Sequence, residues 1–173
     1  VIALNSRTQE VLAMGHEAWH MIGRTPGYIV AVRPLRQGAI TDFDAVIRMN
    51  PRFINGWVNR GAVHARERRY EAAESDFDQA LKIDPIHTVT LTNRASVRTE
   101  RGNLEGALAD FTKLIQIEPS NPQHWIERAK TRFRLKDRAG TITDLEETLK
   151  RAPPDWPRRR EAGEVLKDLQ KPE

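Results

Sequence analysis

Apolar residues recur at helical spacing along most of the chain. In residues 71–83, EAAESDFDQALKI, they fall at Ala73, Phe77, Ala80, Leu81 and Ile83. These spacings place the side chains along one face of a helix, whereas a strand would alternate apolar and polar positions. The segment is therefore predicted to be an amphipathic helix.

The same pattern returns at a fixed interval. Four prolines stand at Pro51, Pro85, Pro119 and Pro153, each 34 residues after the previous one. Three further sets share this interval: large apolar residues (Phe43, Phe77, Phe111, Leu145), mostly small residues (Ala39, Ala73, Ala107, Thr141) and aliphatic residues (Ile47, Leu81, Ile115, Leu149). Proline lacks the amide donor of a helix interior, so each proline is expected to follow the end of a helix. A period of this length predicts a stacked array of helical hairpins.

Another helix is expected before each of these segments. In this helix the 34-residue period carries large residues at Trp57, Leu91 and Trp125, and small residues four positions later at Gly61, Ala95 and Ala129. This register resembles the tetratricopeptide repeat, whose pattern is W-x2-L-G-x2-Y, then A-x3-F, then P. The resemblance covers residues 54–153 well and 37–53 in part. It implies an all-α fold, a right-handed superhelix of stacked helical hairpins (an α-solenoid) with a C-terminal capping helix.

The expected boundaries follow from the frame. Repeats are expected over 54–87, 88–121 and 122–155, with a degenerate first repeat over 23–53 and a capping helix over 156–173. For the capping helix, Asp155 is the expected N-cap and Pro157 lies in the first turn. Its apolar stripe comprises Ala162, Val165, Leu166 and Leu169.

The front of the chain departs from the frame. Ser6 and Gln9 form a capping-box signal, which predicts an N-terminal helix over 1–22. Beyond it, two readings remain: the first hairpin carries a four-residue insertion, or its first helix is replaced by a short one over 26–33, capped by Thr25. We favour the second reading.

Charged residues share the period as well. Aspartates recur at one frame position and arginines at another: Asp42, Asp76, Asp110, Asp144; Arg60, Arg94, Arg128. Antiparallel helices bring these positions to the same height, so each arginine is expected to pair with the aspartate of its own hairpin. The alternative is a set of solvated surface charges that contribute about 0–1 kcal/mol each.

Composition narrows the classes of protein. The absence of cysteine from the 173 residues rules out a disulfide framework, a thiolate zinc site and a cysteine nucleophile. No apolar run approaches the ~18 residues of a membrane span, and a cytoplasmic location is the default expectation. The net charge of +4 and the arginine clusters 66–69 and 158–160 allow RNA or polyanion binding as an alternative function.

One catalytic motif appears, HEAWH at 16–20, which matches the H-E-x-x-H of zinc metallopeptidases. A catalytic zinc needs a third protein ligand, and Pro26 stands where the extended motif would place one. The preferred interpretation is that these two histidines lie on a helix face beside the array. A remnant of a zinc metallopeptidase is the third candidate function, after protein binding and RNA or polyanion binding. No phosphate loop or G-x-S-x-G appears, so we expect no enzyme activity, no cofactor and no metal site.

A binding function is what the resemblance implies. In this family, the first helices of successive hairpins line a concave groove that holds a peptide or partner helix from another protein. The positions that match the groove here are Asn55, Asn59, Arg66, Asn93, Ser96, Glu100, Gln123, Lys130 and Arg134. Asn59 and Asn93 can each donate and accept a hydrogen bond with a peptide backbone.

A well-known subgroup clamps the carboxylate end of chaperone tails with lysines, asparagines and an arginine spread over three repeats. Asn93 fits that pattern. Val58 and Ala62 replace the first pair of clamp residues, and Gln123 and Glu127 replace the last. Chaperone-tail binding is therefore not expected, and the class of ligand stays open.

Overall fold

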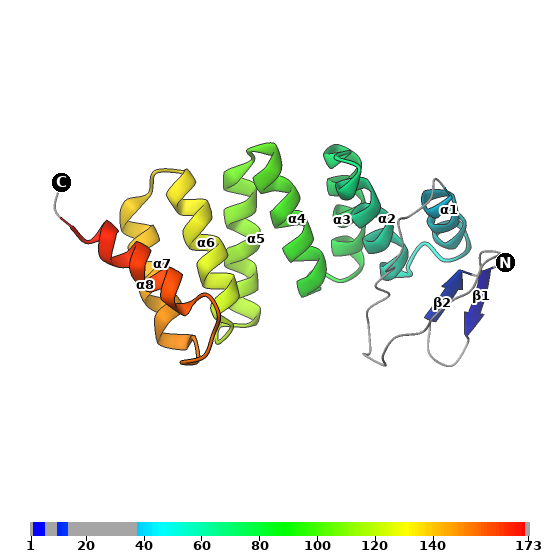
Figure 1. The fold of residues 1–173 in the computed structure, drawn as a ribbon. Coiled ribbons are helices and arrows are strands. Elements are labelled where there is room, and N and C mark those ends of the chain that lie inside the picture. Colours follow the sequence, from blue (N-terminus) through cyan, green and yellow to red (C-terminus); the bar gives the residue numbers. More distant parts are fainter. Residues whose placement is uncertain (1, 6–9, 14–37, 172–173) are drawn as a thin grey trace.

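A computed structural model describes residues 2–5, 10–13 and 38–171. Two short strands, β1 (Ile2–Asn5) and β2 (Glu10–Ala13), precede a row of helices (Figure 1). The helices are α1 (Ala39–Met49), α2 (Ile54–Arg66), α3 (Tyr70–Ile83), α4 (Thr88–Arg101), α5 (Leu104–Ile117), α6 (Pro122–Arg134), α7 (Arg138–Arg151) and α8 (Arg159–Leu169). Across the described ranges, no helix is both long enough and apolar enough to span a membrane.

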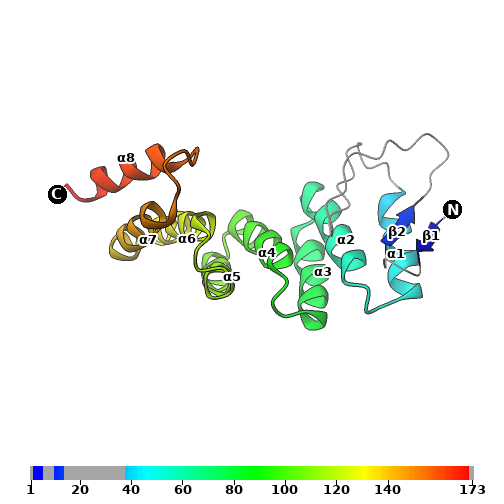
Figure 2. The same cartoon turned by 90° about the horizontal axis from the view of Figure 1, so that it is seen from below.

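The helices form an elongated array in which each packs on its neighbours along the chain (Figures 1 and 2). Hairpins α2–α3, α4–α5 and α6–α7 are the three complete repeats, so the predicted α-solenoid is confirmed. Most contacts join consecutive helices, and within the described residues α2 and α4, which are not consecutive, also touch over a small area. This contact places the first helices on the shorter side of the array, which we call the inner face.

Small residues allow the two helices of a hairpin to approach closely. A Cβ added at Gly61 would lie 2.7 Å from Cε1 of Phe77, so only glycine fits in α2 at this point. Phe77 itself is fully buried, as are Ala73 and Leu91. The core is therefore a series of clusters between helices, as expected of an array in which each unit contacts only its neighbours.

The three first helices end in the same turn. The residues Arg68, Gly102 and Lys136 have φ of 59°, 79° and 61°, and the amide that follows each of them donates to a carbonyl five residues earlier. This is the Schellman motif, which favours glycine because an L side chain in the left-handed region costs about 1–2 kcal/mol. Gly102 suits the motif, whereas Arg68 and Lys136 are strained there.

The predicted N-terminal helix is wrong over residues 2–5 and 10–13. These two segments form β1 and β2, which pair antiparallel in the register Ile2↔Ala13 to Asn5↔Glu10. Both segments are short apolar runs, and pairing between strands outweighs a local capping-box signal. The helix proposed for 26–33 and the HEAWH motif lie outside the described residues.

The capping helix is present but begins later than expected. Arg158, not Asp155, is the N-cap residue, and it makes no capping hydrogen bond through its side chain. Ala162 and Leu166 are buried against α6 and α7, and Leu169 packs beside them. Val165, which we expected in this stripe, is 41% exposed. Pro157 has no amide hydrogen to donate, and a turn over 156–159 precedes the helix, which begins at Arg159.

Candidate protein-binding face

Arginines on the first helices fix the register of the array. Arg60 binds Asp76 and Arg94 binds Asp110, in each case the aspartate of its own hairpin. Nε and Nη2 of each arginine donate to the two carboxylate oxygens of that aspartate. Arg128 binds Asp144 in the same way, at 2.9 and 2.7 Å. The three aspartates are buried, so the predicted pairing is confirmed. Asp42, the fourth aspartate in this frame, is exposed on α1.

Each of these arginines also reaches the preceding hairpin. Nη1 of Arg60 contacts Asp44 at 2.5 Å, and Nη1 of Arg94 contacts Asp78 at 2.6 Å. In the third repeat, Arg128 meets the hydroxyl of Thr112 at 3.3 Å instead. One side chain therefore links three helices, and hydrogen bonds to the aspartates raise the pKa of Arg60. We missed this second contact in the sequence, although Asp44 and Asp78 share the period.

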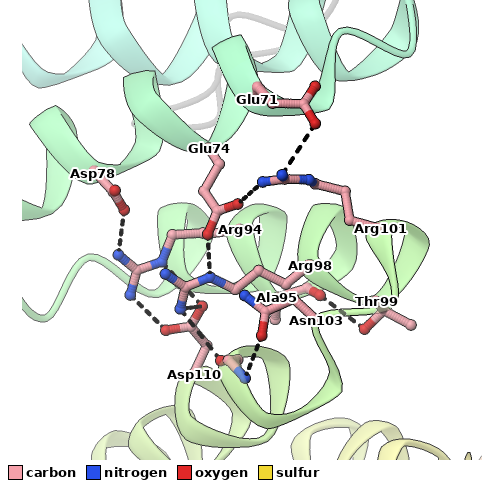
Figure 3. Close-up of polar contacts among 11 residues, drawn as sticks. Glu71, Glu74, Asp78, Arg94, Ala95, Arg98, Thr99, Arg101, Asn103 and Asp110 are labelled. Carbon is pink, nitrogen blue, oxygen red and sulfur yellow. Dashed lines mark hydrogen bonds and ion pairs between the residues drawn. The ribbon is translucent and has the colours of Figure 1, made fainter.

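Figure 3 shows a second row of ion pairs between α3 and α4. Arg98 donates from Nε to Glu74 at 2.7 Å and from Nη1 to Asp110 at 2.9 Å, and Arg101 also binds Glu74. Burial raises the pKa of Glu74, but the hydrogen bonds from Arg98 and Arg101 outweigh it and lower the pKa below its usual value. Charges thus hold these two hairpins together.

The residues equivalent to Arg98 in the other two repeats have buried nitrogen atoms without hydrogen-bond partners. Arg132 contacts Asp144, but its buried Nε has no hydrogen-bond partner. His64 approaches Asp76 at 3.8 Å, and its buried Nδ1 has no partner. Burial lowers the pKa of His64, against the attraction of Asp76.

The arginine rows leave two asparagines available on the inner face. Asn59 on α2 and Asn93 on α4 directly precede Arg60 and Arg94, and both are half-buried. Neither side chain makes a hydrogen bond within the described part of the chain. Because the arginines fix α2 and α4 against their neighbours, the two free amides are held one repeat apart. Asn55, one turn before Asn59, is half-buried as well.

The third repeat is different, because its predicted groove residues contact one another. Gln123 donates to Glu127 at 2.8 Å, and Nζ of Lys130 lies 3.6 Å from the same carboxylate. Arg158, from the turn before α8, also binds Glu127 at 2.7 Å. The structure thus brings Gln123 and Lys130 together around a carboxylate that is already neutralised, which the sequence frame did not indicate.

The remaining groove positions are exposed near the ends of the first helices. Ser96 donates its hydroxyl hydrogen to the carbonyl of Thr92 in its own helix. Arg134 donates to the carbonyl of Thr99 on α4, at 3.0 Å. Arg66 and Glu100 are exposed without a side-chain contact to any described residue.

Several arginines of the two sequence clusters have structural contacts. Arg159 donates to the carbonyl of Leu149 at 2.7 Å, which satisfies an end of α7. Arg158 binds Glu127, Arg160 binds Glu164, and Arg69 binds Glu67. Among the described residues, no group of three or more potential ligands could hold a metal ion.

Comparison with known proteins finds two different likenesses along the chain. The family model described as tetratricopeptide repeat matches residues 54–87, and the MreB/Mbl protein family model matches residues 1–69. The cell shape-determining protein Mbl of Bacillus subtilis is 53% identical over 55 residues, which are 32% of this chain and 16% of Mbl. MreB of Escherichia coli is 48% identical over 46 residues, 27% of this chain and 13% of MreB. The chain therefore spans only a small part of the length of these relatives.

Solved structures resemble the helical array. A tetratricopeptide repeat protein from Parabacteroides merdae has a TM-score of 0.68 at 23% identity, over 76% of this chain and 52% of that one. MamA has a TM-score of 0.66 at 14% identity, over 76% and 80% of the two chains. The first tetratricopeptide domain of Spaghetti, bound to an HSP90 peptide, has a TM-score of 0.58 at 22% identity, over 67% and 89%. At these identities the likeness concerns the fold.

Proposed function

Because this chain contains tetratricopeptide repeats, we propose that it is a protein-interaction module that binds an extended segment of another protein along the inner face of α2 and α4. The observation that carries the proposal is the pair Asn59 and Asn93, half-buried and without hydrogen-bond partners among the described residues. An amide that is partly shielded from water and unpaired costs free energy, so a ligand that pairs with these side chains is favoured.

An extended peptide fits these amides. A side-chain amide both donates and accepts, as a peptide group does, so each asparagine can bind one peptide unit of the ligand backbone. Neighbouring first helices pack about 8–10 Å apart, a distance that about three extended residues span. Recognition of this kind depends weakly on the ligand side chains. In Spaghetti, the comparable domain holds an HSP90 peptide.

The chain differs from a carboxylate clamp in the third repeat. Glu127 stands where that pattern has a cation, and Arg158 already binds its carboxylate. Val58, in place of the first clamp lysine, is buried in the core. We therefore expect ligands that bind through their backbone and not through a terminal carboxylate.

The test is a selection of binding peptides from a random displayed library, followed by affinity measurements on the selected peptides. Changing both Asn59→Ala and Asn93→Ala should weaken their binding about tenfold, since two hydrogen bonds are lost, and should leave the helical circular dichroism signal unchanged. The matched control is Gln116→Ala on the exposed surface of α5, which should bind as the original chain does. Equal affinity in the double variant would place the binding site elsewhere.

The MreB/Mbl likeness favours a second candidate. A segment of 55 residues in this chain shares about half of its side chains with part of Mbl. We propose that residues 1–37 attach the array to a cell shape-determining protein of this family. Purified Mbl of Bacillus subtilis should bind the full chain and not a chain that begins at residue 38. Equal binding by both, or by neither, would remove this candidate.

A further inference from the structure

The turns inside the hairpins carry an unexplained feature. They lie along one edge of the array, the upper edge in Figure 1, and the proline-containing connections lie along the other. At this turn edge, Arg68 and Lys136 occupy left-handed positions where Gly102 fits without strain in the intervening repeat. Backbone strain that persists often marks a functional site. Both strained residues are cationic, exposed, and without a side-chain contact among the described residues.

Each strained cation has a second cation beside it. Arg66, two residues before Arg68, closes α2, and Arg134, two residues before Lys136, closes α6. Arg66 makes no side-chain contact within the described ranges, and Arg134 uses one nitrogen on the carbonyl of Thr99. The intervening repeat has Glu100 and Gly102 at these two positions. The edge therefore presents two cationic turns separated by a turn whose cation, Arg101, is already bound to Glu71 and Glu74.

We propose that these two turns, Arg66 with Arg68 and Arg134 with Lys136, bind two acidic clusters of a partner polypeptide that lies across the ends of α2, α4 and α6. This inference rests on the proposed function and names the chemistry of its ligand. Glycine at both positions would relieve the strain, but glycine would not supply the cationic side chains.

The spacing limits the ligand. First helices of neighbouring repeats lie no closer than the 8–10 Å, approximately, of helices in direct contact, so the two turns are at least about 16–20 Å apart, a distance that an extended chain covers in about six residues. The ligand should therefore carry two acidic pairs whose centres are about six positions apart, with neutral residues between them, because Glu100 repels a carboxylate there.

A polypeptide fits this edge better than a nucleic acid does. A phosphate backbone carries a negative charge at every nucleotide and favours a continuous basic stripe. Here the stripe is interrupted by Glu100, and Arg69, Arg158 and Arg160 are already bound to glutamates. RNA is therefore the competing outcome in the test.

The test uses fluorescence anisotropy with three labelled synthetic peptides of equal length. The first has two glutamate pairs separated by four neutral residues, the second has four consecutive glutamates, and the third has glutamines in place of the glutamates. Oligouridine RNA is the fourth probe. We expect the first peptide to bind most tightly and the glutamine peptide to bind most weakly. No binding of the first peptide, or tighter binding of RNA, would overturn the proposal.

A double variant separates binding from structure. Arg68→Gly with Lys136→Gly should raise the melting temperature by about 2–8 °C, because strain is removed, and should weaken the first peptide about fivefold, because two charges are lost. Lys82→Gln removes an exposed cation from α3 and should change neither. Unchanged peptide affinity in the double variant would contradict the proposal. If peptides selected from the library bind through Asn59 and Asn93 but ignore this double variant, the proposed function stands and this inference fails.

Discussion

At the scale of single residues, the same frame position has different consequences in different repeats. Position 61 is glycine where 95 and 129 are alanine, and position 64 is histidine where 98 and 132 are arginine. The repeats therefore provide internal comparisons, because each substitution found in one unit can be moved to another.

Gly61 offers the clearest case. Gly61→Ala should lower the free energy of unfolding by about 1–3 kcal/mol, because the new Cβ would lie 2.7 Å from the ring of Phe77. Gly163→Ala on α8 is the matched control: its Cβ would meet nothing within 4 Å, so helix propensity should raise stability by about 0.5–1 kcal/mol. Urea unfolding measures both. A stabilising Gly61→Ala would refute the close packing of α2 on α3.

Arg132 lacks a partner that Arg98 has. Glu74, which binds Nε of Arg98, is replaced one period later by Leu108. Nε of Arg132 has no hydrogen-bond partner, and the carboxylate of Asp137 lies 3.6 Å from it. Leu108→Glu should therefore raise the free energy of unfolding by about 0.5–1.5 kcal/mol, and Glu74→Leu should lower it by about 1–3 kcal/mol. Loss of stability in both variants would show that the two interfaces are not equivalent.

His64 gives the fold a dependence on pH. Its folded pKa is lowered from 6.5 by burial, so the unfolded chain takes up the proton first as the pH falls. The contribution of His64 to the free energy of unfolding should be full at pH values well above 6.5 and should be lost as the pH falls below it through the lowered pKa of the folded state. His64→Gln should flatten the curve in this range, because it removes the titrating group. Parallel curves for the two proteins would assign the effect to another group.

At the scale of elements, the sequence predicted the middle of the array better than its ends. The helices from α2 to α7 follow from the period, because each contacts similar neighbours in the next unit. The hairpin β1–β2 depends on pairing between two separate segments, which a local signal at Ser6 and Gln9 cannot report. The second partners of Arg60 and Arg94 were within reach of the sequence, since Asp44 and Asp78 are also one period apart.

The capping helix can be tested on adjacent residues. Leu166→Asp should detach α8, because this side chain is buried against Ile126 and Leu145, and should cost about 2–4 kcal/mol. Val165→Asp places the same charge on a side chain that is 41% exposed and should be nearly neutral. Chemical denaturation distinguishes the two. Equal effects would mean that α8 does not pack in the register described.

At the scale of the whole molecule, the array holds its inner face in a fixed register through charge and packing together. Arg60, Arg94 and Arg128 each link neighbouring hairpins, and the buried clusters fill the space between them. What could be predicted of the site was the set of positions on the first helices. Asn59 and Asn93 remain free, whereas Gln123 and Lys130 contact Glu127, which also binds Arg158 from the turn before α8. The repeat pattern does not encode these contacts of the third repeat.

The most direct measurement is an NMR titration of the full chain with a peptide selected from the random library. The side-chain amide signals of Asn59 and Asn93 should shift together and saturate at one peptide per chain, because both amides bind the same ligand backbone. Signals from the outer surface of α5, such as the side-chain amide of Gln116, should stay in place. Shifts confined to that outer surface, with Asn59 and Asn93 unchanged, would contradict binding on the inner face.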